Sequence, residues 1–196
     1  AVTIANGHTV TLTANQTALS CTINSGGTLS LGSNTLTLTA ANPLSISGTF
    51  TPGTGTIEYS ASGATVANTT YNGLKISGSV TGSTTATVGG TLNVTGTFTP
   101  SAGTITMNNG STITNNGPSD ASLVFYNLTT ATSATVTANT SFSVAGTLTN
   151  GSSATLSPTS GTITMGGGST ITNSGTLLSF NNLTINSTGG AVTANT

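Results

Sequence analysis

Charged side chains are almost absent from this sequence of 196 residues. Asp, Glu, Lys and Arg together make up 2% of the chain and are represented by Glu58, Lys75 and Asp120, whereas an average soluble domain carries about 25%. The formal net charge of −1 provides no electrostatic attraction for nucleic acid or for an anionic membrane surface. We therefore expect no nucleic-acid partner, and a folding stability that depends little on pH or salt.

Residues for catalysis or metal binding are also scarce. His8 is the single histidine and Cys21 the single cysteine, which excludes a zinc site of the usual composition and an intramolecular disulfide. Glu58 and Asp120 lie about one repeat apart and out of phase, which argues against a pair of catalytic carboxylates. A triad of His8, Asp120 and a serine lacks the Gly-x-Ser-x-Gly motif. We predict no catalytic residue, no cofactor and no metal, so the chain is predicted not to be an enzyme.

Long apolar runs and tryptophan are missing as well. No run reaches the length of a membrane helix, so membrane insertion is not expected. Phe and Tyr make up 4% of the chain, too few for the aromatic platform of a carbohydrate-binding surface. The sequence starts AVTIANG without Met or a basic leader, which is typical of a mature secreted protein and equally of a trimmed chain. An extracellular or cell-surface location is the prediction.

Short strand signals are present along the whole sequence. Thr, Val and Ile alternate with polar residues in segments separated by NG, GG and NNG turns. The clearest segments are 8–14, 34–40, 103–107, 134–138, 141–146 and 182–186. Because amphipathic helical patterns are not found, an all-β fold is predicted.

The sequence also repeats itself. GTIEY at Gly55 returns as GTITM at Gly103 and Gly161, which gives spacings of 103 − 55 = 48 and 161 − 103 = 58 residues, and GTFTP occurs at Gly48 and Gly96. A GATVAN or GSTITN element and an aromatic-Asn-Leu element follow in each unit. The order of elements is kept while loop lengths vary, as in stacked repeats. We predict one array over 1–196, with repeats at roughly 1–54, 55–102, 103–160 and a partial repeat at 161–196.

Short strands within such a repeat fit a parallel β-helix, or β-solenoid, with about two coils per repeat. In that fold Val, Ile, Leu and Phe face a narrow core, Thr and Ser face outward, and Gly and Asn form the corners. A β-sandwich is the alternative, because its strand spacing is similar, but near-copies of strands favour the solenoid. The predicted inward residues include Ile105, Ile113, Leu128, Ile163, Ile171, Leu183 and Ile185.

Both ends of the sequence have the pattern of incomplete repeats. GGAVTANT stops where the preceding repeat continues, AVTIANG starts the same element again, and neither end carries a charged or helical cap. Either the chain is a slice of a longer array, or the open end of one copy is completed by the start of the next, which produces a head-to-tail filament. The predicted assembly residues are Ala1, Val2, Thr3, Ile4, Ala191, Val192, Thr193 and Ala194.

The single Glu and the single Lys are 17 residues apart (75 − 58), close to one predicted coil. The first prediction for Glu58 and Lys75 is a salt bridge between stacked strands. The sharper alternative is an amide cross-link from Lys75 to an Asn or Asp, with Glu58 moving the proton. An intact mass lower by one ammonia or one water would reveal that cross-link.

Asn-x-Ser/Thr sequons are numerous, although a chain this rich in Asn, Ser and Thr contains many by chance. They make glycans candidate partners if the chain passes a glycosylating secretion route. The candidate acceptors are Asn15, Asn68, Asn93, Asn109, Asn127, Asn139, Asn150, Asn182 and Asn186.

The segment GTLNVTGTFTPSAGTITM, residues 90–107, resembles the parallel β-helix regions of secreted adhesins of the filamentous-haemagglutinin and autotransporter type. The resemblance implies a structural role at the cell surface or outside the cell, although those adhesins carry more charge. We therefore predict a non-enzymatic subunit of an extracellular filament or sheath that binds copies of itself. The alternatives are an adhesin segment that binds a surface or carbohydrate, and an ice-binding protein, because Thr-x-Thr runs form ladders that order water.

Overall fold

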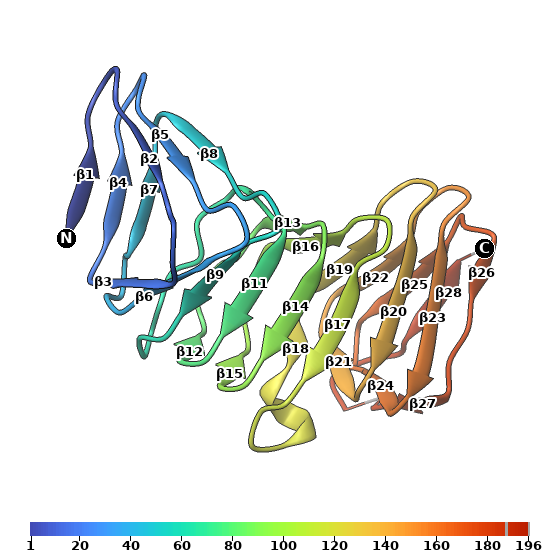
Figure 1. The fold of residues 1–196 in the computed structure, drawn as a ribbon. Helices are drawn as coiled ribbons and strands as arrows, with labels where there is room; N and C mark the ends of the chain where they lie inside the picture. Colours follow the sequence, from blue (N-terminus) through green and yellow to red (C-terminus); the bar gives the residue numbers. More distant parts are fainter. Residues whose placement is uncertain (187, 196) are drawn as a thin grey trace.

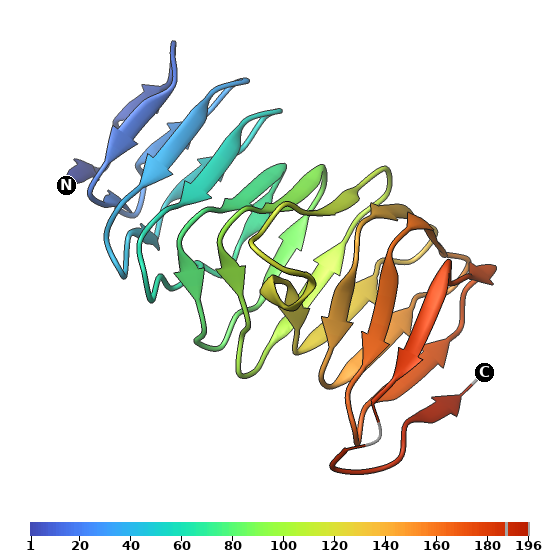
Figure 2. The same cartoon turned by 90° about the horizontal axis from the view of Figure 1, so that it is seen from below.

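The structure is a computed structural model that describes residues 1–186 and 188–195. It is an all-β solenoid of about 10 turns in which parallel strands stack, and 2% of it is helical. The predicted β-solenoid is therefore confirmed, and the antiparallel sandwich is not formed. The N-terminal and C-terminal coils lie at opposite ends of the stack (Figures 1 and 2).

One face of the solenoid is a sheet of nine strands that runs along the molecule. Its strands come from successive coils, and it contains both charged residues of the predicted salt bridge. In spatial order they are β3 (Gln16–Ala18), β6 (Thr35–Leu38), β9 (Thr56–Tyr59), β11 (Gly73–Ile76), β14 (Thr91–Val94), β17 (Thr112–Asn115), β20 (Thr135–Asn139), β23 (Thr155–Ser160) and β26 (Leu177–Leu178).

A second face is a sheet of seven strands, and the labels from β13 onward follow one another towards the C-terminal end in Figure 1. They are β10 (Thr70–Tyr71), β13 (Ala86–Val88), β16 (Thr104–Met107), β19 (Asn127–Thr130), β22 (Thr147–Asn150), β25 (Thr170–Asn173) and β28 (Thr193–Asn195).

The third face is built from a pair and a group of four, which a bridge between Phe98 and Leu123 connects. The pair is β12 (Ser79–Val80) and β15 (Thr97–Phe98), and the group is β18 (Val124–Phe125), β21 (Phe142–Val144), β24 (Thr162–Met165) and β27 (Asn182–Ile185). A short 3₁₀ turn, η1 (Asp120–Ser122), precedes β18.

The first three coils, residues 1–59, have two sheets of their own besides their share of the nine-stranded sheet. One consists of β1 (Val2–Ile4), β4 (Cys21–Ile23) and β7 (Leu44–Ile46), and the other of β2 (Thr9–Thr11), β5 (Thr28–Ser30) and β8 (Thr49–Thr51). In the order of the chain, the sheet of β1, β4 and β7 takes the position that the third face occupies in later coils. The sheet of β2, β5 and β8 takes the position of the seven-stranded sheet. We call residues 1–59 the N-terminal stack.

The segment 60–69 separates the N-terminal stack from the later coils on two faces. It contains no strand, and it lies against β12 through a hydrogen bond from the Ser79 amide to the Ala61 carbonyl, 3.0 Å. Only the nine-stranded sheet continues across it, through the pairing of β9 with β11. Along the chain the segment lies between β9 and β10, where later coils have one strand of the third face.

The length of a coil varies because the corners differ in length. Paired residues are 74 − 57 = 17 apart between Ile57 and Leu74, and 138 − 113 = 25 apart between Ile113 and Ala138. Other pairs lie between these values, such as 92 − 74 = 18 between Leu74 and Leu92 and 171 − 148 = 23 between Leu148 and Ile171, so most coils are shorter than half of the 48-residue spacing. The prediction of about two coils per repeat was wrong, because eight strand positions, or 8/3 turns, separate the two GTITM strands β16 and β24.

Because the sequence repeat is not a whole number of coils, the copies of a repeated strand lie on different faces. GTIEY forms β9 in the nine-stranded sheet, and the GTITM copies form β16 in the seven-stranded sheet and β24 on the third face. The aromatic-Asn-Leu elements behave in the same way, since they form β11, β19 and β27. The three faces can therefore accept the same sequences.

The core is a narrow column of inward side chains, with aromatic rings stacked along part of it. Phe98 and Phe125 contact edge to face with ring centres 6.0 Å apart, and Phe125 and Phe142 with centres 5.4 Å apart. The predicted inward residues Ile105, Ile113, Leu128, Ile163 and Ile171 are buried. Leu183 and Ile185 continue the same columns but are 41% and 48% exposed, because they lie in the last coil.

The corners explain the recurrence of Gly and Ser. Ser133 and Ser153 lead into the nine-stranded sheet with φ of 57° and 56°, a left-handed conformation that few residues adopt without strain. At a different corner, a Cβ atom on Gly96 would collide with the carbonyl of Gly78 in the coil below. Substitution of Gly96 would therefore push neighbouring coils apart.

Candidate functional site

The residues considered for a catalytic centre are dispersed. His8 lies exposed before β2, and Asp120 lies exposed in η1 beside a hollow of about 330 Å³ lined mainly by Ser and Thr. Among the described residues no three His, Cys, Asp or Glu side chains come together to hold a metal ion. Cys21 is buried, and burial raises the pKa of its thiol, which disfavours the reactive thiolate.

Glu58 and Lys75 are brought together on the outer side of the nine-stranded sheet. Their strands pair directly, and Lys75 Nζ lies 3.1 Å from Glu58 Oε1. Ser77 donates a second hydrogen bond to Glu58 Oε1 at 2.6 Å, and Thr37 donates one to Oε2 at 3.2 Å. Partial burial raises the pKa of Glu58, but these hydrogen bonds and the Lys75 charge outweigh it, so the pKa is lowered overall.

Asn93 completes this row as the partner of Lys75 on the next strand, β14. The structure thus supplies an amide beside the lysine, as an amide cross-link would require. The lowered pKa of Glu58 favours the carboxylate, which is a weaker base than a carboxylate of raised pKa for removing a proton from Lys75. The cross-link stays a prediction, and intact mass is the measurement that tests it.

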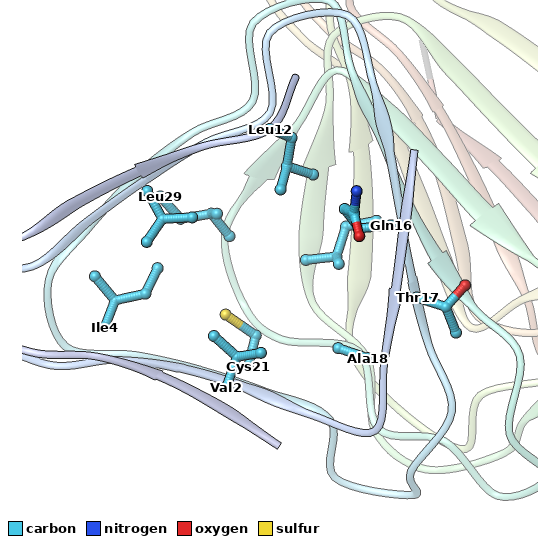
Figure 3. Close-up of a pocket in the computed structure, with 10 residues that line it drawn as sticks. Val2, Ile4, Leu12, Gln16, Thr17, Ala18, Cys21 and Leu29 are labelled. Atoms are coloured by element: carbon cyan, nitrogen blue, oxygen red, sulfur yellow. The ribbon is translucent and has the colours of Figure 1, made fainter. Parts of the chain in front are cut away.

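The N-terminal end of the solenoid is open and apolar. A hollow of about 140 Å³ there is lined mostly by inward side chains of the first two coils (Figure 3). Val2 and Val10 are 44% and 36% exposed, whereas Ile23 and Leu29 in the second coil are 0% and 1% exposed. The lining residues are Val2, Ile4, Val10, Leu12, Gln16, Thr17, Ala18, Cys21, Leu29 and Leu36.

Apolar side chains are exposed at the C-terminal end as well. Leu177 in β26 and the pair Leu183 and Ile185 in β27 are 47%, 41% and 48% exposed. The partners of the pair in β24, Ile163 and Met165, are 1% and 0% exposed. The difference is one of position, because no further coil lies over β26 and β27 in the described part of the chain.

Comparisons with known proteins give no relative for this chain. Neither the protein-family models, nor the curated proteins, nor the solved structures contain a match.

The predicted assembly residues lie at these two ends. Val2–Ile4 form β1, the edge strand of its three-stranded sheet, and Thr193 and Ala194 lie in β28, the edge of the seven-stranded sheet. Ala1 and Ala191 are exposed beside them, and Val192 packs partly against the core. Val10 and Leu177, which the sequence prediction did not include, are exposed at the same two ends, because strand alternation does not reveal which strands lie in a terminal coil.

The sequon residues differ in accessibility. Asn150 is buried, accepts a hydrogen bond from Thr130 at 2.7 Å, and donates to Asn173 and to the Leu177 carbonyl, both at 2.9 Å. A glycan on Asn150 would require the coil to open. Asn93 and Asn127 are half-buried, and the exposed acceptors are Asn15, Asn68, Asn109, Asn139, Asn182 and Asn186.

Membrane insertion through a helix has no support in the described residues, since none of their helices has the length and apolar character to cross a bilayer.

Proposed function

We propose that this chain is a non-enzymatic structural subunit that stacks head to tail on copies of itself to form an extracellular filament or sheath. The observation that carries the proposal is the exposure of core-type side chains at both ends of the solenoid. Val2 and Val10 at one end and Leu183 and Ile185 at the other are 36% to 48% exposed. Stacking would cover both sets at once.

The backbone supports the same arrangement. In the described chain the last strands on the three faces are β26, β27 and β28, and the first are β1, β2 and β3. All of them have one open edge with unpaired amide and carbonyl groups, which favour pairing with another strand. One end meeting the other is a heterologous contact that does not close, so repetition extends the assembly.

The composition supports an assembly more than a dispersed monomer. With 2% charged residues, the surface has little charge repulsion to keep copies apart. The resemblance to secreted adhesins supports the extracellular location, and exposed sequons such as Asn15 and Asn109 would suit glycans that restore solubility. An adhesin role is less well supported, because the sequence has few aromatic residues for a carbohydrate platform.

Electron microscopy of the undenatured 196-residue chain tests the proposal. Uniform filaments are expected, with an axial repeat of about 48 Å from about ten coils at about 4.8 Å per coil. Dispersed single rods across a concentration series would contradict self-stacking.

Two substitutions then locate the contact. Leu183→Asp places a charge on the exposed apolar end and is expected to abolish filaments, since the stacked interface would bury it. Thr164→Asp is the matched control, because Thr164 pairs with Thr184 on the same face but is flanked by strands on both sides. If Leu183→Asp forms filaments as readily as Thr164→Asp does, the apolar end is not the contact.

A further inference from the structure

Threonines form a continuous column on the outer side of the seven-stranded sheet. Six successive strands place Thr at the same register position, and Asn195 of β28 ends the column. The members are Thr70, Thr87, Thr106, Thr129, Thr149 and Thr172. The sequence shows Thr-x-Thr runs, but only the register shows which of them share a face.

A second column runs beside the first, two residues earlier on each strand. It contains Thr104, Asn127, Thr147, Thr170 and Thr193. Asn127 links its neighbours, since its amide donates to Thr104 Oγ1 at 3.4 Å and its side-chain oxygen accepts from the Thr147 amide at 2.8 Å. The two columns form a lattice with about 4.8 Å between strands and about 6.6 Å, two residues, along each strand.

The hydroxyl groups of the first column remain available to an external partner. Within residues 1–186 and 188–195, no side-chain hydrogen bond joins the hydroxyls of Thr87, Thr106, Thr129, Thr149 or Thr172 to another protein atom. On the nine-stranded sheet, by contrast, Thr112 bonds Thr137 at 3.2 Å and Thr37 bonds Glu58. Branching at Cβ restricts each Thr to few rotamers, so methyl and hydroxyl groups can keep a constant orientation along the column.

The lattice is also uncharged. The charged residues Glu58 and Lys75 interrupt the corresponding row of the nine-stranded sheet, whereas the two columns contain only Thr and Asn. A surface that repeats in two dimensions without charge fits a partner that is itself periodic and neutral. Crystalline water is such a partner, and a crystalline polysaccharide is the rival. The columns lack the aromatic side chains that would stack on sugar rings, which favours water.

We propose that the outer face of the seven-stranded sheet binds ice through the two columns. The methyl groups and hydroxyls hold a layer of water in the spacing of the lattice, and this layer joins the growing crystal. The proposal goes beyond self-stacking and does not depend on it, because the columns lie along the side of the solenoid rather than at its ends.

Thermal hysteresis and partition into a slowly growing ice front test the proposal on the 196-residue chain. The unsubstituted chain is expected to separate the freezing point from the melting point and to enrich in the ice fraction. Thr149→Tyr is expected to abolish both effects, because a large ring in the middle of the column breaks the lattice, while Tyr remains favourable in a strand. Thr129→Tyr repeats the test on the neighbouring strand.

Thr114→Tyr is the matched control. Thr114 and Thr149 are half-buried and hold the same place in the strands Thr112–Asn115 and Thr147–Asn150, but Thr114 lies on the nine-stranded sheet. Retained activity in Thr114→Tyr, with unchanged far-UV circular dichroism in all variants, supports the assigned face. Three outcomes would overturn the proposal. The first is an unsubstituted chain with neither thermal hysteresis nor enrichment in ice, and the second is a loss of both effects in Thr114→Tyr as large as in Thr149→Tyr. The third is binding to crystalline cellulose or chitin without binding to ice.

Discussion

At the residue scale, the ion pair between Glu58 and Lys75 is a local feature with a measurable signature. The Lys75 side chain is 35% exposed and the Glu58 side chain 16%, so solvent screens the attraction and the pair contributes at most about 1 kcal/mol. The chain has few other groups that titrate in acid. A change in the free energy of unfolding between neutral and acidic pH can therefore be assigned to this ion pair with few competing explanations.

Glu58→Gln is expected to reduce the loss of stability in acid. The lowered pKa of Glu58 in the folded chain means that its contribution is complete above the unfolded value of about 4.3 and disappears as the pH falls through the folded value. Urea unfolding at pH 7 and pH 3 measures this difference. Asp120→Asn is the control, because Asp120 is exposed in η1, and it should retain the acid loss due to Glu58. The same acid loss in Glu58→Gln and in the unsubstituted chain would contradict the assignment.

How far the sequence predicts single residues depends on whether the neighbouring coil is known. The pairing of Glu58 with Lys75 follows from a separation close to one coil and the scarcity of other charges. The burial of Asn150 does not follow, because Asn150 belongs to a sequon and its partners Thr130 and Asn173 lie in other coils. An alternating pattern identifies the two sides of a strand but not the loop that closes over its last residue.

At the element scale, the strands were predictable and their faces were not. The predicted segments 103–107 and 182–186 contain β16 and β27, because alternation of Thr with Ile or Leu is strong there. The face of each strand depends on the sum of all preceding corner lengths, which vary between coils. Near-identical GTITM strands therefore occupy the seven-stranded sheet and the third face, and the Thr columns could not be assembled from sequence.

The aromatic ladder is the element-scale feature that we expect to dominate local stability. Phe125 has an edge-to-face ring contact on both sides, with Phe98 and Phe142. Phe125→Ala is expected to lower the free energy of unfolding by about 3–5 kcal/mol, since a buried ring leaves a cavity that the coils cannot close. Urea denaturation followed by circular dichroism measures the effect.

Phe180→Ala provides the comparison for that substitution. Phe180 packs against the core but is only partly buried in the last coil, so its removal should cost clearly less than removal of Phe125. Equal losses would mean that the ladder adds nothing beyond ordinary burial of a ring.

At the scale of the whole molecule, the solenoid is not uniform along its axis. The N-terminal stack continues into the later coils through the nine-stranded sheet, while segment 60–69 interrupts the other two faces. Contacts in a solenoid are mainly between neighbouring coils, so a weak junction separates regions that can open independently. Two buried tyrosines hold the segment: Tyr71 donates to the Ala67 carbonyl at 2.8 Å, and the Ala67 amide donates to Tyr59 at 3.1 Å.

Tyr71→Phe is expected to loosen this junction without removing the ring. It deletes the bond to Ala67 and the 2.7 Å contact between the two tyrosine hydroxyls, which leaves buried polar groups unpaired at a cost of about 1–3 kcal/mol. Hydrogen exchange in 60–69 and proteolytic cleavage there should both accelerate, and the N-terminal stack should exchange faster than the later coils. Tyr126→Phe is the control, because Tyr126 is 40% exposed and the same deletion should leave exchange unchanged. Uniform acceleration along the chain in Tyr71→Phe would show instead that the solenoid unfolds as one cooperative unit.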